Sequence, residues 1–289
     1  MMRWDRMRES SNVEDNRSSG GGMVGGGLRL GVGGIAVAVV VGLLLGKSPM
    51  EILGFVMQLS GNQPVATQGA RPAATDNDQN KQMVAHVLGD TEDTWKQLFA
   101  EQADAQYVAP KLVLFRNAVQ SACGQASSAV GPFYCPADSK VYLDLGFFDE
   151  LHRRFGAPGD FAAAYVVAHE VGHHVQNQLG ISDKVHQAEQ KLSKAAANAL
   201  SVKLELQADC FAGVWGHYAS QRGVLEAGDL EEALKAANAI GDDTLQRNAG
   251  HSIAPDSFTH GTSEQRMHWF RQGFDNGNMK LCNTFAKGA

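Results

Sequence analysis

The stretch YVVAHEVGHHVQNQLG, residues 165–180, constrains the fold more than any other part of the chain. Its apolar residues Val167, Val171 and Val175 repeat every four positions, which predicts an amphipathic helix packed against a core. The same stretch carries three histidines and a glutamate. Because a buried polar group without a partner costs several kcal/mol, on the order of 2–7, the fold must supply partners for these side chains.

His169, Glu170 and His173 form the pattern H-E-x-x-H. Residues four positions apart on a helix lie about 40° apart around its axis, so both imidazoles can reach one metal ion. Glu170 projects beside them, where it is better placed to touch a metal-bound water than the metal. A chance pattern, or a pair of hydrogen-bonded core histidines, is the alternative explanation.

A second acidic pair favours the metal site. It lies in ELQADCFAGVWG, residues 205–216, where Glu205 and Asp209 are again one helical turn apart. Their apolar neighbours argue against a solvent-facing acidic helix. Two histidines, one carboxylate and one water make the open tetrahedral zinc site that is typical of catalysis. We therefore predict a Zn²⁺ site in which either carboxylate could be the third ligand.

The remaining apolar patterns predict an α+β domain that is mostly helical and has a small β-sheet. The run KVYLDLGFF, residues 140–148, has the composition of a strand. Helical periodicity continues at about 160–179, 183–220, 229–240 and 263–275.

The N-terminal part differs in composition, because residues 30–45 form a run of sixteen without a charge. As a helix this run spans roughly 24 Å, close to the ~30 Å hydrocarbon core of a membrane. A buried core helix would show a polar stripe, and a cleaved signal peptide would be followed closely by a small-residue cleavage site; the sequence has neither. We therefore predict a single N-terminal transmembrane helix at residues 28–46.

Basic residues set the predicted topology. Five arginines precede residue 30, whereas only Lys47 closely follows the apolar run, so the N-terminus is expected in the cytoplasm. The predicted location is the cell membrane, with the catalytic domain outside the cytoplasm. The predicted segments are a cytoplasmic N-terminal segment at 1–27, the anchor at 28–46, a juxtamembrane helix and linker at 47–80, and the domain at 81–289.

The four cysteines fit an exported domain, in which two disulfides are expected. Cys123 and Cys135 bracket a turn-rich loop that a disulfide would close, and Cys210 and Cys282 then pair by elimination. Neither pair has the C-x-x-C spacing of a zinc knuckle or a redox site.

The chain resembles the bacterial family of neutral zinc metallopeptidases, which are membrane-anchored. The resemblance covers nearly the whole chain and rests on MRWDRMRESSNVEDNR, VGPFYCPADSKVYLDLGFF, AHEVGHHVQ, ELQADCFAGVW and FTHGTSEQRMHWFRQGF. H-E-x-x-H followed by E-x-x-x-D is also similar to the gluzincin peptidases, which implies a zincin-like domain. That similarity implies Glu205 as the third zinc ligand and Asp209 as a hydrogen-bond partner of a ligand histidine. The segment FTHGTSEQR, residues 258–266, resembles a late His-containing segment of membrane-associated peptidases of that clan, which implies that His260 hydrogen-bonds the oxyanion and that Arg266 braces the site.

Together these features predict a membrane-anchored zinc endopeptidase in which Glu170 activates a zinc-bound water. The expected partner is a peptide or protein substrate. We expect it to pair with an edge strand formed by Val141, Tyr142 and Leu143, because this strand closely precedes the zinc helix.

Two other functions remain open. The first is a non-enzymatic envelope binding module with structural zinc, although such a site needs no Glu170. The second is a zinc amidase acting on cell-wall peptides, although the sequence shows no carbohydrate-binding aromatic cluster. The formal net charge of −6, without a basic stripe, argues against a nucleic-acid partner. The sequence leaves the oligomeric state open.

Overall fold

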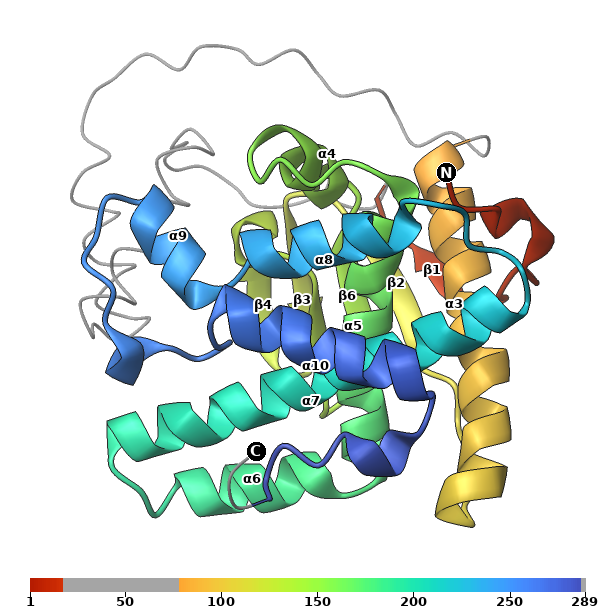
Figure 1. Ribbon diagram of the computed structural model, residues 1–289. Coiled ribbons are helices and arrows are strands. Elements are labelled where there is room, and N and C mark those ends of the chain that lie inside the picture. Colours follow the sequence, from red (N-terminus) through yellow and green to blue (C-terminus); the bar gives the residue numbers. More distant parts are fainter. Residues whose placement is uncertain (18–77, 287–289) are drawn as a thin grey trace.

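Helices make up most of the part of the chain that the computed structural model describes, residues 1–17 and 78–286 (Figure 1). A π-helical turn, Phe99–Ala103, extends the first long helix. The helices are α3 (Gln79–Leu98), α4 (Gly146–Arg153), α5 (Asp160–Gln178), α6 (Ile181–Glu189), α7 (Lys194–Gln221), α8 (Asp229–Ala239), α9 (Asp242–Asn248) and α10 (Ser263–Asn276).

The main sheet has four strands in the order β1 (Val13–Asp15), β2 (Lys111–Phe115), β6 (Lys140–Asp144) and β5 (Phe133–Cys135). β1, β2 and β6 are parallel, and β5 is antiparallel to β6. A separate hairpin consists of β3 (Ala118–Ser121) and β4 (Gly124–Ser127). The predicted class, a mostly helical α+β fold with a small sheet, is confirmed for the described residues.

The predicted substrate edge strand is wrong. Val141, Tyr142 and Leu143 belong to β6, which pairs with β2 on one side and with β5 on the other. All three side chains are buried, as expected for a strand inside a sheet. The edge strand on this side of the sheet is β5.

The prediction of a single-pass membrane anchor is also wrong. β1, near the N-terminus, pairs with β2 of the domain, so both lie on the same side of any membrane, whereas one span between them would separate them. Arg17 and Asp78, which flank the undescribed segment, form a salt bridge. Among the described residues no helix is long and apolar enough to cross a membrane. The proposed span itself, residues 28–46, lies outside the described residues.

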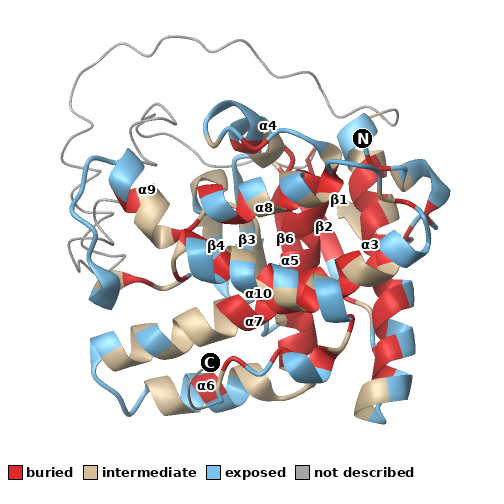
Figure 2. Cartoon of the chain, viewed as in Figure 1, coloured by how far each residue is buried: buried red, intermediate tan, exposed pale blue. Residues whose placement is uncertain are grey.

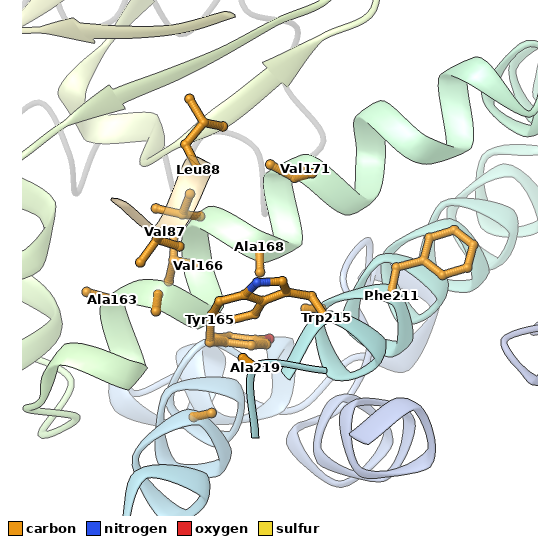
Figure 3. Close-up of a cluster of buried hydrophobic side chains, with 14 of the residues drawn as sticks. Val87, Leu88, Ala163, Tyr165, Val166, Ala168, Val171, Phe211, Trp215 and Ala219 are labelled. Atoms are coloured by element: carbon orange, nitrogen blue, oxygen red, sulfur yellow. The ribbon is translucent and has the colours of Figure 1, made fainter. Parts of the chain in front are cut away.

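Helix α5 lies at the centre of the fold and is buried along most of its length (Figures 1 and 2). Helices α3, α7 and α8 pack against it. Small side chains in its first turns allow this close packing, since Ala162, Ala163 and Ala164 are all buried. Figure 3 shows part of this core, with side chains of α3, α5 and α7: Val87, Leu88, Ala163, Tyr165, Val166, Ala168, Val171, Phe211, Trp215 and Ala219.

The predicted helix at 183–220 is two helices, α6 and α7, with the break at residues 190–193. Ser193 begins the second one, because its side chain accepts a hydrogen bond from the backbone N–H of Ala196. Thr262 and Gln265 form a complete capping box at the start of α10. These caps fix where α7, which carries Glu205 and Asp209, and α10, which carries Arg266, begin.

Both predicted disulfides are present. Cys123–Cys135 joins the turn between β3 and β4 to the edge strand β5. Cys210–Cys282 joins α7 to the C-terminal segment, across a sequence separation of 72 residues. The first bridge therefore ties the β3–β4 hairpin to the main sheet, and the second ties the C-terminal segment to α7.

Candidate functional site

The structure brings His169 and His173 of α5 together with Glu205 of α7. The Nε2 atom of His169 lies 3.1 Å from Glu205 Oε2, and the Nε2 atom of His173 lies 3.3 Å from Glu205 Oε1. One ligand atom from each residue can be chosen so that all three lie within 4.8 Å of one another, a group that could hold a metal ion.

The donor set and its spacing fit zinc. Zinc holds nitrogen and oxygen ligands in a tetrahedron with bonds of about 2.0–2.1 Å, which places ligand atoms roughly 3.3–3.4 Å apart. At this site each imidazole Nε2 faces its own oxygen of Glu205, at 3.1 and 3.3 Å, so the carboxylate can present one oxygen or both to an ion between the histidines. The part that His169, His173 and Glu205 play in binding zinc stays a prediction, now with geometry that suits it.

A glycine allows this approach of the two helices. Gly172 lies inside the H-E-x-x-H motif, and a methyl group on its Cα would lie 2.9 Å from the carbonyl oxygen of Ala208 on α7. Without that close contact the α7 backbone would move away from α5 and carry Glu205 with it. Gly172 occupies a position that the H-E-x-x-H motif leaves unspecified, and it allows Glu205 to lie close to the two histidines.

Charged side chains support His169 from behind. Its Nδ1 atom lies 2.8 Å from Asp209 Oδ1, so Asp209 contacts the imidazole on the side away from Glu205. Arg266 of α10 donates two hydrogen bonds to the Asp209 carboxylate, from Nε at 2.8 Å and Nη2 at 2.9 Å. Tyr165 donates a third, at 2.6 Å. Asp209 and Arg266 thus occupy the positions that the family resemblance implies.

The electrostatics of this cluster keep Asp209 ionised. Burial alone would raise the pKa of its carboxyl, but Arg266 and His169 outweigh burial and lower that pKa to about 2. Burial would likewise raise the pKa of Glu205, but the two histidines hold it well below its ordinary value. Both carboxylates are therefore charged at neutral pH.

A neutral partner supports His173. Its Nδ1 atom lies 2.9 Å from the amide oxygen of Gln176, one turn further along α5. Sequence reasoning missed Gln176, although its spacing of three residues from a ligand histidine could have indicated it.

Glu170 lies in a cleft of about 1220 Å³ that also contains His169, His173 and Glu205. Burial raises the pKa of the Glu170 carboxyl, and the positive charge of the two histidines opposes that rise. A carboxylate whose proton affinity is raised in this way is suited to accept and release a proton near neutral pH.

His260 lines the same cleft and is held by a residue that the sequence did not indicate. Asp242 accepts hydrogen bonds at Oδ2 from the backbone N–H groups of Thr259, His260 and Gly261. Its Oδ1 lies 3.3 Å from His260 Nδ1. Partial desolvation in the cleft would lower the pKa of His260, whose side chain is 50% exposed, but Asp242 and Glu205 together raise that pKa. The role of His260 in stabilising an oxyanion stays a prediction.

Comparison with known proteins agrees with this site. Residues 2–285 match a protein family described as "Putative neutral zinc metallopeptidase". The chain is 52% identical over 291 residues to "Uncharacterized protein YpfJ" of Escherichia coli (strain K12), with 99% of each chain covered. It is 44% identical over 191 residues to "Uncharacterized protein Rv2575" of Mycobacterium tuberculosis, covering 62% of this chain and 64% of that protein. No solved structure matches. The chain belongs to this family of neutral zinc metallopeptidases.

Proposed function

We propose that the protein is a zinc-dependent peptidase that cleaves peptide bonds in the cleft beside His169, His173 and Glu205. The observation that carries this proposal is the position of Glu170, a buried carboxylate in the same cleft as the three candidate ligands. A purely structural zinc site needs neither an open cleft nor a base beside it.

The chemistry divides between the ion and the chain. When bound, zinc would polarise the carbonyl of the substrate and lower the pKa of a water molecule. Glu170 then accepts a proton from the attacking water and delivers it to the leaving nitrogen. His260, whose pKa Asp242 and Glu205 raise, can donate a hydrogen bond to the carbonyl oxygen as negative charge develops there.

The edge strand that lines the cleft supports an extended peptide as the substrate. Phe133 and Tyr134 of the edge strand β5 line the cleft together with Glu170. β5 pairs with β6 on one side, and no described strand pairs with its other side. A peptide can therefore pair with the free backbone groups of β5, which gives affinity without strict side-chain selection.

Metal analysis and a proteolysis assay test the proposal together. We expect the full-length protein to bind one zinc per chain and to cleave a mixture of denatured proteins. Glu170→Gln should keep the zinc and lose cleavage, because it removes the proton acceptor and leaves the ligands. Glu231→Gln, an exposed glutamate on α8, is the matched control and should cleave like the wild type.

The outcomes separate the alternatives. A protein that binds zinc but cleaves nothing would support a structural site and contradict the peptidase. Full cleavage by Glu170→Gln would contradict the assigned base. Cleavage that survives complete removal of zinc would overturn the metal centre.

A further inference from the structure

A continuous line of hydrogen bonds runs from His173 to the C-terminal disulfide. Beyond its contact with His173, Gln176 approaches two oxygens with its amide nitrogen: Leu204 O at 2.7 Å and Gln207 Oε1 at 3.1 Å. The amide nitrogen of Gln207 lies 2.8 Å from the carbonyl oxygen of Cys282. Both glutamine side chains are buried, with exposed fractions of 0% and 5%, so water does not compete for these bonds.

Two backbone carbonyls, those of Leu204 and Cys282, fix the direction of this line. A backbone carbonyl can only accept a hydrogen bond, so Gln207 must turn its NH₂ group to Cys282 and its oxygen to Gln176. Gln176 must then turn its NH₂ group to Gln207 and to the carbonyl of Leu204. Its own oxygen therefore faces His173, where only a protonated Nδ1 can donate to it. Each step leaves one orientation, and the last one sets the tautomer of the imidazole.

We propose that Gln176 and Gln207 are positioning residues that hold His173 with its proton on Nδ1 and the lone pair of Nε2 directed at the metal. The Cys210–Cys282 disulfide anchors the acceptor at the far end, because the carbonyl that orients Gln207 belongs to Cys282. The proposal rests on the metal site proposed above and adds a part of the chain, residues 279–284, that lies far from it in sequence.

The line of hydrogen bonds gives a reason for the two buried amide side chains of Gln176 and Gln207. A glutamine buried among apolar residues is costly unless all its donors and acceptors are satisfied. The hydrogen bonds described above engage the oxygen and the nitrogen of both amides and orient both in one direction only. A metal-binding imidazole commonly needs such a partner at its other nitrogen, and loss of that partner lowers metal affinity about 10–100-fold.

Metal affinity and a cobalt spectrum test this in the full-length protein. Zn²⁺ affinity is measured against a competing chelator, and the site is also loaded with Co²⁺, whose visible absorption reports ligand geometry. Gln176→Met should lower Zn²⁺ affinity by about 10–100-fold and change the cobalt spectrum. Gln207→Met should act in the same direction but by only a few-fold, since Leu204 still orients Gln176.

Gln246→Met is the matched control for a structural effect. Gln246 is also a buried glutamine whose side chain makes hydrogen bonds, to Ser257 and to the backbone of Ala254. Its loss should lower thermal stability without changing Zn²⁺ affinity or the cobalt spectrum. Equal changes in the Gln207→Met and Gln246→Met proteins would overturn the proposal.

The two disulfides provide a second test that does not depend on the glutamine variants. Cys210→Ala/Cys282→Ala should lower Zn²⁺ affinity, and Gln207→Met should add little to that loss, because both changes remove the same link. Cys123→Ala/Cys135→Ala removes the other bridge and should leave Zn²⁺ affinity unchanged. If the wild type binds zinc and cleaves protein while Gln207→Met keeps full Zn²⁺ affinity, the proposed role of this line of hydrogen bonds is overturned and the proposed function stands. A wild type that binds no zinc would overturn the proposed function with it.

Discussion

The two candidate ligand histidines sit on one helix but have different surroundings behind them. His169 faces a cluster of opposite charges on α7 and α10, formed by Asp209 and Arg266 with the hydroxyl of Tyr165. His173 faces a line of neutral amides that passes from α5 through α7 to the C-terminal segment. Both arrangements present an acceptor to Nδ1, and both are buried.

The difference lies in what each arrangement can do besides orienting a ring. A buried carboxylate paired with a guanidinium must be complete, because removing one partner leaves a charge without compensation. Neutral amides leave no uncompensated charge when one of them is removed. They act by orienting the imidazole ring through hydrogen bonds. Damage behind His169 should therefore lower folding stability as well as metal affinity, whereas damage behind His173 should lower mainly metal affinity.

The largest expected loss of zinc binding comes from replacing Glu205, the candidate ligand that lies between the two histidines. Glu205 contacts both imidazoles, so Glu205→Ala should remove nearly all zinc binding and abolish cleavage. Asp209→Ala, one turn away, should lower affinity by only ~10–100-fold, the usual effect of losing a partner behind a ligand. Zinc titration against a chelator separates the two. If Asp209→Ala loses the metal while Glu205→Ala keeps it, the roles of the two carboxylates are exchanged.

Arg266→Met should give the largest loss of folding stability. It leaves Asp209 charged, fully buried and without its guanidinium, which costs about 3–5 kcal/mol. Arg153→Met is the control: that side chain is 72% exposed and pairs with Asp149, whose side chain is 52% exposed. Its loss should cost about 1 kcal/mol or less, as for surface pairs. Equal costs in urea unfolding would contradict the claim that the buried charge of Asp209 depends on Arg266 for compensation.

Gly172→Ala tests the spacing between α5 and α7, on which the contacts behind both histidines depend. A methyl group at 2.9 Å from the Ala208 carbonyl oxygen forces α5 and α7 apart, at a cost of about 1–3 kcal/mol. Since Glu205 lies on α7, Zn²⁺ affinity should fall as well. Gly223→Ala, where nothing lies within 4 Å but φ is +70°, is a control for strain without crowding. It should destabilise the fold without affecting the metal.

The sequence predicted the parts of the site that repeat along a helix. His169, His173, Glu205 and Asp209 follow one-turn spacings that any helix places on one face, and the structure brings them together. The description of the matching family agrees with a zinc site. Local periodicity was enough here because each pair lies within a single element.

Contacts between distant segments could not be predicted in this way. β6 has the alternating composition of a strand, but only the pairing of β5 outside it decides that β6 is no edge. The apolar run at 30–45 suggested a membrane span, yet β1 before it pairs with β2 after it. Asp242 and the line from Gln176 to Cys282 likewise join residues far apart in sequence, which no spacing rule indicates.

His260, which lines the same cleft, is a third histidine whose partner can be compared with those of His169 and His173. Replacing this partner should have the smallest effect on cleavage. His260 has a charged partner, Asp242, so this support should set proton affinity as well as orientation. Asp242 raises the pKa of His260, and cleavage that needs the protonated ring is lost as pH rises through that pKa. Asp242→Asn keeps an oxygen for the backbone N–H groups but removes the charge, so the alkaline limb of kcat/KM should move to lower pH. The lost hydrogen bond strength is about 0.5–1.5 kcal/mol, so kcat/KM at neutral pH should fall by about tenfold or less.

The control for this variant is Asp243→Asn, the neighbouring aspartate. Asp243 accepts hydrogen bonds from the backbone and hydroxyl of Ser263 at the start of α10, and no described contact joins it to His260. Its replacement should lower stability and leave the pH profile in place, because the charge that acts on His260 is unchanged. An alkaline limb that stays fixed in Asp242→Asn would show that His260 does not carry the proton that this limb reports. A charged partner would then orient this ring only, as the neutral amides do for His173.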